Sequence, residues 1–209
     1  EALVTQDFVE LGGKQYYNDK WMERILEYEG GQFNRVLLDE QIADLQAETD
    51  RRFKYMGFVE SMAPIGDYLY LSTSIGHFIK VDPEEDKFRF ITSTKQPQEI
   101  VQNHEDETVF YTDARGDIYR LDQGEISSRV YRGQGGEFRR MIYSDRSIYA
   151  YQNLNDQIIR LDLEGNNSGV IYSAGPDEII VSYDIKASII YVLTYNLEYS
   201  RNKLHIIGG

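Results

Sequence analysis

The chain contains no cysteine among its 209 residues, and only three histidines, four prolines and one tryptophan. Without cysteine it can form neither disulfide bonds nor thiolate metal sites. The three histidines are not spaced as paired metal ligands, which argues against a histidine-based zinc site. No apolar run approaches the length of a membrane span, no signal peptide stands at the start, and no nucleophile elbow or phosphate-binding glycine loop is present.

Basic residues are also scarce relative to acidic ones. The 35 Asp and Glu against 22 Lys and Arg give a formal net charge of −13 and a pI near 4.7. Nucleic acids and anionic membranes both require a basic surface, so neither is expected as the main partner. The 17 tyrosines favour half-buried β-strands, and the 41% hydrophobic content fits a globular protein.

The most informative pattern is one phrase repeated at a fixed spacing. Phe78–Asp82, Ile118–Asp122 and Ile158–Asp162 each alternate apolar and polar residues and end in aspartate, with successive aspartates 40 residues apart. A period of this size indicates a repeat protein whose units bury their apolar faces against their neighbours.

Each repeat unit is predicted to consist of short antiparallel strands, A to D, separated by polar turns. The predicted strands are, unit by unit, Phe8–Leu11, Gln15–Tyr17, Arg24–Tyr28 and Arg35–Leu38; Val59–Met62, Tyr68–Leu71, Phe78–Val81 and Phe88–Thr92; Ile100–Asn103, Thr108–Tyr111, Ile118–Leu121 and Ser128–Tyr131; Arg139–Ser144, Ile148–Tyr151, Ile158–Leu161 and Gly169–Tyr172; Ile179–Tyr183, Ile189–Leu193 and Leu204–Ile207. The fifth unit therefore lacks a fourth strand.

Four-stranded units of about 40 residues predict an all-β fold of the β-propeller type, with about five blades. The units cover approximately 1–55, 56–95, 96–135, 136–175 and 176–209, as a single propeller domain or a segment of one. Between the first two units, helical spacing around Asp39–Phe53 predicts a short inserted helix. Its narrow apolar stripe favours a solvated connector over a partner-binding helix.

Two families of propellers share local features with this sequence. Val109–Asp113 followed by Ile118–Asp122 resembles the YWTD repeat of low-density-lipoprotein-receptor-type propellers, and Tyr16–Asp19 resembles part of it. The glycine-rich Gly133–Phe138, and more weakly Gly175–Ile179, is similar to the turn between blades of NHL-like bacterial propellers. Both resemblances imply protein or ligand binding more often than catalysis, and usually six blades.

An acidic residue precedes strand A in four of the five units, namely Asp7, Glu99, Glu137 and Glu178, whereas the second unit has Gly57. Strand A is innermost in a propeller, so these carboxylates are expected to ring one mouth of the central channel. Two interpretations remain open, a site for a cation and a repeated structural device. The repetition favours the structural role.

Two acidic loops, Asp162–Ser168 and Asp82–Asp86, place oxygen-bearing side chains as a calcium loop does, but they lack its central glycine and terminal glutamate. Both fall at predicted C–D hairpin turns, and we interpret them as turns. No metal ion or cofactor is predicted.

Ligand contacts are expected from the loops between strands B and C and between blades, at one face. The candidate binding residues are Trp21, His77, Arg115, Asn153, Asn155, Tyr199 and Arg201. Trp21 and other exposed aromatics suit a sugar or a protein contact, although packing against a neighbouring blade would also explain Trp21.

The sequence favours a non-enzymatic scaffold that binds a protein or an extracellular glycan through this loop face. One alternative is a glycoside-processing enzyme that uses the channel carboxylates as acid and base. Another is a structural segment of a larger propeller or multidomain surface protein. The expected location is extracellular or in the cell envelope.

The missing fourth strand leaves an open edge at Leu204–Ile207. We expect this edge to be covered, either by the first residues of the chain or by protein outside it, and the six-blade habit of the two families favours the second.

Overall fold

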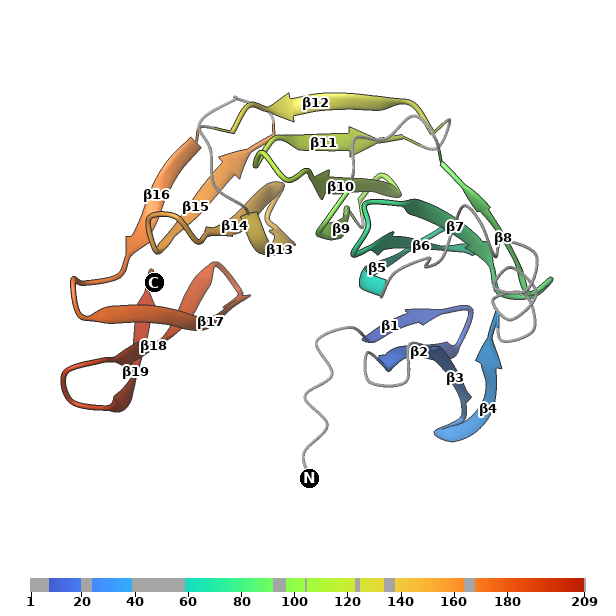
Figure 1. Ribbon diagram of the computed structural model, residues 1–209, viewed down its shortest axis with the longest axis horizontal. Coiled ribbons are helices and arrows are strands. Elements are labelled where there is room, and N and C mark those ends of the chain that lie inside the picture. The colour runs from blue at the N-terminus through green and yellow to red at the C-terminus, as the bar shows by residue number, and fades with distance from the viewer. Residues whose placement is uncertain are drawn as a thin grey trace. The chain divides into compact units, whose positions relative to one another are not determined.

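The computed structural model describes residues 8–19, 24–38, 59–91, 97–103, 105–122, 125–133, 138–163 and 168–208. These residues form nineteen strands in five antiparallel sheets, at the nineteen positions predicted from the sequence, with ends shifted by a few residues (Figure 1). The predicted helix around Asp39–Phe53 lies outside the described residues. The fold is all-β and of the β-propeller type, and each sheet is one blade.

Three blades belong wholly or mainly to the first part of the chain. Sheet A comprises β1 (Phe8–Leu11), β2 (Lys14–Asp19), β3 (Arg24–Glu29) and β4 (Gln32–Leu37). Sheet B comprises β5 (Val59–Ile65), β6 (Tyr68–Thr73), β7 (Phe78–Asp82) and β8 (Lys87–Phe90). Sheet C comprises β9 (Ile100–Asn103), β10 (Thr108–Thr112), β11 (Ile118–Leu121) and β12 (Ser127–Tyr131).

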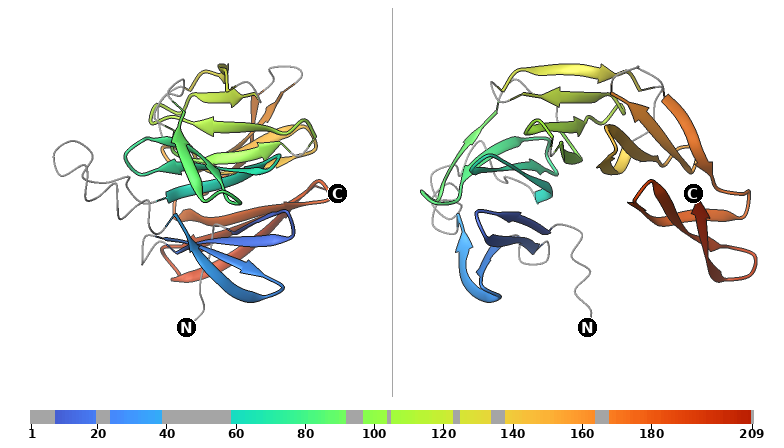
Figure 2. Two further views of the ribbon diagram at one scale, coloured as in Figure 1. Left: turned by 90° about the vertical axis from the view of Figure 1, so that its right-hand side faces the viewer. Right: turned by 180° about the vertical axis from the view of Figure 1, so that it is seen from behind.

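Two blades follow. Sheet D comprises β13 (Phe138–Ser144), β14 (Ser147–Gln152), β15 (Gln157–Asp162) and β16 (Ser168–Ser173). Sheet E has three strands, β17 (Glu178–Lys186), β18 (Ile189–Asn196) and β19 (Arg201–Ile207), which Figure 2 shows from two further directions. The chain divides into two compact units, Glu1–Ala114 with Tyr119–Ser128, and Arg115–Ile118 with Arg129–Gly209.

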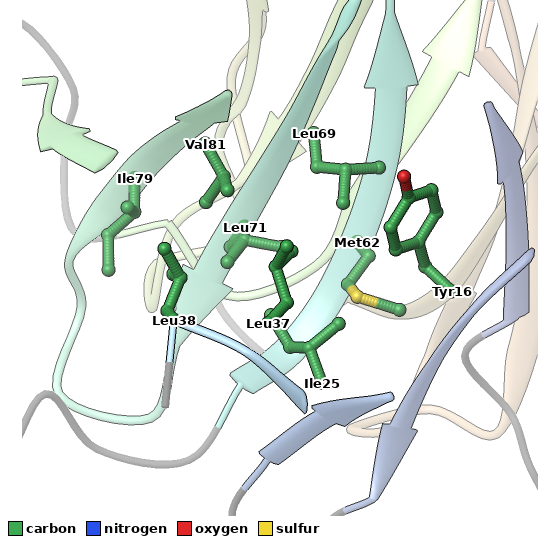
Figure 3. Packing of buried hydrophobic residues seen from close by; sticks show 9 residues of the cluster. All are labelled: Tyr16, Ile25, Leu37, Leu38, Met62, Leu69, Leu71, Ile79 and Val81. Atoms are coloured by element: carbon green, nitrogen blue, oxygen red, sulfur yellow. The ribbon is translucent and has the colours of Figure 1, made fainter. Parts of the chain in front are cut away.

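Within each unit the blades pack face to face, as the alternating apolar residues of the strands require. Between sheets A and B, Ile25 and Leu37 are buried with Leu71 and Ile79 (Figure 3). The first strands of neighbouring sheets adjoin, β1 beside β5 and β5 beside β9 in the first unit, and β13 beside β17 in the second. Within each unit, the first strands of successive blades therefore lie next to one another.

Between sheets A and B the packing includes a buried charge. The side chain of Glu27 in β3 is wholly buried, and its carboxylate accepts hydrogen bonds from Arg35 at 3.1 Å and Asn34 at 2.5 Å. Lys14 lies 3.8 Å from the same carboxylate and 2.7 Å from Glu84 in the C–D turn of the next blade. This network joins the two blades, because both Lys14 and Arg35 also contact the turn of sheet B.

The repeated aspartates occupy equivalent positions at the end of each third strand, as the 40-residue period predicts. Asp82 and Asp162 are the last residues of β7 and β15, and Asp122 directly follows β11. The Asp82 carboxylate accepts two backbone N–H bonds of its turn, both at 3.1 Å, and the Asp122 carboxylate accepts one at 2.9 Å. Each aspartate that makes these bonds shapes its C–D hairpin, in the way aspartates form Asx turns.

Candidate functional site

The antiparallel order of the strands fixes which loops share an end of each blade. Strand B turns into strand C at the same end at which strand D leads to the next blade, and we call this the B–C end. The turns at this end include 74–77, 113–117, 153–156 and 197–200. The predicted binding residues His77, Arg115, Asn153, Asn155 and Tyr199 lie in these four turns. Arg201 begins β19 at the same end, and Trp21 lies outside the described residues.

His77 is held by its own blade. Its backbone N–H donates to the Thr73 hydroxyl at 3.0 Å, and its ring meets Phe90 edge-on with centroids 5.0 Å apart. The ring is half-buried, whereas the neighbouring Ile75 is exposed. His77 therefore packs within sheet B, and its role as a ligand contact stays a prediction.

The turn of sheet C, residues 113–117, is also organised by internal contacts. The Asp117 carboxylate accepts hydrogen bonds from Arg129 at 3.1 Å and from the backbone N–H of Gly133 at 2.8 Å. Gly133 approaches this turn closely, since a Cβ atom on it would lie 2.5 Å from the carbonyl oxygen of Gly116. Arg115, in contrast, is exposed to solvent at the tip of the turn.

In the turn of sheet D, residues 153–156, side-chain hydrogen bonds join the residues around Leu154, which stays at the surface. The Tyr151 hydroxyl donates to Asp156 at 2.6 Å, and the Asn155 amide donates to Gln152 at 3.4 Å. Burial, reinforced by Asp156, raises the pKa of Tyr151 to about 12, so this hydroxyl remains a donor at neutral pH. Leu154 is 67% exposed between these anchored residues.

The turn of sheet E, residues 197–200, presents an aromatic side chain beside the cation of Arg201. The Tyr199 backbone N–H donates to the Asn196 side chain at 2.8 Å, which fixes the turn. The Arg201 guanidinium lies 5.2 Å from the centroid of the Tyr199 ring, within the range of a cation–π contact. Leu197 and Tyr199 are both exposed large hydrophobic residues.

The short linker between sheets D and E contacts the turns of both sheets. Ala174 donates its N–H to the Asp156 carbonyl at 3.0 Å, and Asp177 accepts at its carbonyl from the Leu197 N–H at 2.8 Å. Ala174 and Asp177 are three residues apart, and an extended chain of that length spans roughly 11 Å. The turns of sheets D and E therefore lie close together at one surface of the second unit.

Sequence reasoning selected the polar and aromatic residues of these turns but missed three exposed aliphatic ones, Ile75, Leu154 and Leu197. A signal was available, since each stands inside a turn, where an apolar residue has no core to enter. The resulting surface of the second unit, Leu154, Leu197, Tyr199 and Arg201, is called the turn patch below.

The predicted ring carboxylates are described at two positions, because Asp7 and Glu137 lie outside the described residues. Glu99 directly precedes β9, and its backbone pairs with Thr112 in the neighbouring strand. Glu178 is the first residue of β17, one position inside the strand rather than before it.

The Glu178 carboxylate contacts three side chains of its own unit. The Tyr172 hydroxyl donates to it at 3.4 Å, Lys203 lies 3.7 Å away, and the His205 Nε2 lies 3.6 Å away. Burial, together with Glu178, raises the pKa of the Tyr172 hydroxyl. These contacts tie together strands of sheets D and E.

In the described part of the chain, no group of three or more His, Asp or Glu side chains is arranged so that it could hold a metal ion. Within the same residues, no helix has the length and apolarity to cross a membrane.

The five blades define a repeat protein of the β-propeller type, and comparisons with known structures agree. No model of a protein family matches the sequence, and no curated protein is significantly similar to it. Among solved structures, 771 chains are similar. One comes from the crystal structure of a nidogen/laminin complex, with a TM-score of 0.67 and 12% identity over 97% of this chain and 78% of that chain. Such low identity shows the fold alone, and one fold serves many functions.

Proposed function

We propose that this chain is a non-enzymatic scaffold that binds a protein partner through the turn patch. The observation that carries the proposal is the placement of Leu154, Leu197 and Tyr199 in adjoining turns, where all three side chains are exposed. The backbone N–H groups of Leu197 and Tyr199 are held by hydrogen bonds. When a partner covers large apolar side chains on a fixed surface, their burial lowers the free energy of the complex.

The composition of the patch suits protein recognition. Tyrosine and arginine are over-represented among the residues that dominate binding energy at interfaces, and Tyr199 and Arg201 stand together. The anchored turns would lose little conformational freedom on binding. The net charge of −13 favours partners with basic surfaces, which Glu198 beside the patch would attract.

The comparison with the nidogen/laminin complex supports this proposal, since that structure is by its title a complex of proteins. We also propose an extracellular or cell-envelope location and a relationship to YWTD-like or NHL-like propellers, on the sequence features described above. These finer assignments are part of the proposal.

A glycan is the second candidate ligand, favoured by one observation. The exposed ring of Tyr199 offers a stacking surface, and the Asn153 and Asn155 amides lie in the adjoining turn. The rival function, glycoside processing by channel carboxylates, draws less support, because Glu178 is engaged by Tyr172, Lys203 and His205.

The test uses the purified full chain against an array of extracellular proteins and a glycan array. Leu197→Ser and Tyr199→Ser are each expected to weaken binding to the protein that wild type selects by about tenfold or more. Ile126→Ser is the matched control for Leu154→Ser, because the two side chains are almost equally exposed, 68% and 67%. Ile126 lies in a C–D turn, at the end of its blade opposite to the B–C end.

Binding that Ile126→Ser abolishes and the patch variants leave unchanged would contradict the proposal. Binding to glycans alone, lost with Tyr199→Ser, would establish the second candidate instead.

A further inference from the structure

Two acidic residues, Asp177 and Glu198, adjoin Leu197 of the turn patch. The Asp177 carbonyl accepts the Leu197 N–H at 2.8 Å, and Glu198 is the next residue along the chain. Since neighbouring Cα atoms are about 3.8 Å apart, the two acidic residues stand on either side of this one hydrogen bond. Both are exposed to solvent, as Leu197 is. An apolar side chain and two carboxylates therefore share one small surface.

The chain itself does not neutralise these two carboxylates. Other acidic residues of the same turns and linker have partners, since Asp156 accepts a hydrogen bond from a tyrosine hydroxyl at 2.6 Å and Glu178 contacts Lys203 at 3.7 Å. In the part of the chain that the structure describes, the carboxylates of Asp177 and Glu198 make no hydrogen bond and no ion pair. Like charges close together repel one another, so a cation from outside is attracted by both.

The cation of the turn patch stands on the other side of the turn. Asp177 precedes β17 and Arg201 begins β19, and the order β17-β18-β19 places β18 between them. The Arg201 guanidinium lies over the Tyr199 ring, 5.2 Å from its centroid. The place for an added cation is therefore on the β17 side of the turn, next to Leu197.

We propose that the turn patch recognises a protein segment in which an arginine or a lysine stands between apolar residues, with its cation held by Asp177 and Glu198. The inference rests on the proposed function and specifies the chemistry of the partner. The apolar residues of the segment cover Leu154, Leu197 and Tyr199, which are 67%, 55% and 60% exposed. The aliphatic stem of the basic side chain packs on Leu197, while its charged end reaches the carboxylates.

Neither half of this surface is sufficient alone. An exposed ion pair contributes little to affinity in water, but it strengthens when apolar neighbours exclude water from it. A purely apolar segment would remove water from Asp177 and Glu198 without supplying a partner, which is unfavourable. Arginine suits the pair better than lysine, because its planar guanidinium can donate to two carboxylates at once.

The test screens the full chain against an immobilised library of random synthetic peptides about ten residues long. Peptides that bind the wild type are expected to contain arginine or lysine with an apolar residue on each side. The double variant Asp177→Asn/Glu198→Gln keeps the shape of both side chains and removes both charges. It is expected to bind the selected peptides about tenfold more weakly.

Glu29→Gln/Asp67→Asn is the matched control, because it changes the net charge of the chain by the same amount. Both residues are exposed, and both stand at the end of their blades opposite to the B–C end, Glu29 at the last position of β3 and Asp67 in the turn after β5. This variant is expected to change peptide affinity by less than about twofold. Raising NaCl from about 50 mM to about 500 mM is expected to weaken binding by the wild type and to affect Asp177→Asn/Glu198→Gln little.

Selected peptides without basic residues, or an equal loss of affinity in the two double variants, would overturn the inference. So would a library from which the wild type selects no peptide, whereas the protein array still decides the proposed function. Binding that is lost in Leu197→Ser and kept in Asp177→Asn/Glu198→Gln would uphold the turn patch and reject the charge pairing. Basic peptides that Leu197→Ser binds as well as the wild type does would show attraction by charge alone and contradict the inference.

Discussion

The hydroxyl of Tyr183 in β17 donates a hydrogen bond to the backbone carbonyl of Arg140 in β13, across the boundary between sheets D and E. The carbonyl of Tyr149 lies 3.0 Å from the same hydroxyl. Arg140 has a positive φ of 53° and stands in a β-bulge that turns its carbonyl out of the ladder. The bulge thus exposes an acceptor that the buried tyrosine satisfies.

Replacing Tyr183 with phenylalanine is expected to lower the free energy of unfolding by about 1–2 kcal/mol, because the carbonyl at the bulge loses its donor while the ring packing remains. Urea denaturation measures the change. Tyr191→Phe, on the other face of sheet E, is the control and is expected to change stability by less than about 0.5 kcal/mol. An equal loss in both variants would show that the hydroxyl of Tyr183 has no special role.

Two glycines give a matched pair for backbone packing. A Cβ on Gly133 would meet the carbonyl oxygens of Gly116 at 2.5 Å and Arg115 at 2.7 Å, whereas nothing lies within 4 Å of a Cβ on Gly169. Gly133→Ala is expected to cost about 3 kcal/mol, since backbone must move apart. Gly169→Ala is expected to be neutral or to stabilise by about 0.5 kcal/mol. Thermal unfolding of both variants measures these changes. If Gly133→Ala unfolds at the wild-type temperature, Gly133 does not pack closely against the Gly116 carbonyl.

Glu27 makes the stability of the first unit depend on pH. Burial would raise the pKa of its carboxyl, but the hydrogen bonds from Arg35 and Asn34 and the charges of Arg35 and Lys14 outweigh it, so the pKa lies below its usual value of 4.5. A lowered pKa in the folded state means that the stabilisation is present above the unfolded value and is lost as the pH falls through the folded value.

Glu27→Gln is therefore expected to cost about 2–3 kcal/mol at pH 7 and progressively less below pH 4.5. Glu29→Gln, at an exposed position of the same strand, is the control and is expected to change little at any pH. Urea denaturation between pH 3 and pH 7 supplies the measurement. A deficit in Glu27→Gln that stays constant over this range would mean that the carboxylate charge is not the stabilising element.

Strand positions were predictable because they depend on local alternation and on turn residues. The repeated aspartates are the clearest case, since Asp82 and Asp122 bond the backbone of turns only a few residues away. The candidate site was predictable in part. Which loops share an end of a blade follows from antiparallel order, and so His77, Arg115 and Tyr199 were placed at the B–C end.

Charge partners were not predictable in the same way. The buried Glu27 occupies the position that Lys80, Arg120 and Arg160 hold in later repeats, and nothing local distinguishes a buried ion pair from a solvated one. Its environment comes from Lys14 and Arg35 on two other strands. Likewise, Glu178 was expected as one of a ring of equivalent carboxylates, but it contacts Tyr172 of sheet D and His205 of its own sheet E, which no local pattern indicates.

The sequence by itself determined the number of strands, their order and the equivalence of the repeats, because alternation, turn chemistry and period are properties of neighbouring residues. Only the tertiary structure decided which turns adjoin and which apolar side chains stay exposed. Those features depend on contacts between residues far apart in sequence, such as Ala174 with Asp156 and Leu197 with Asp177, whose geometry no local pattern encodes.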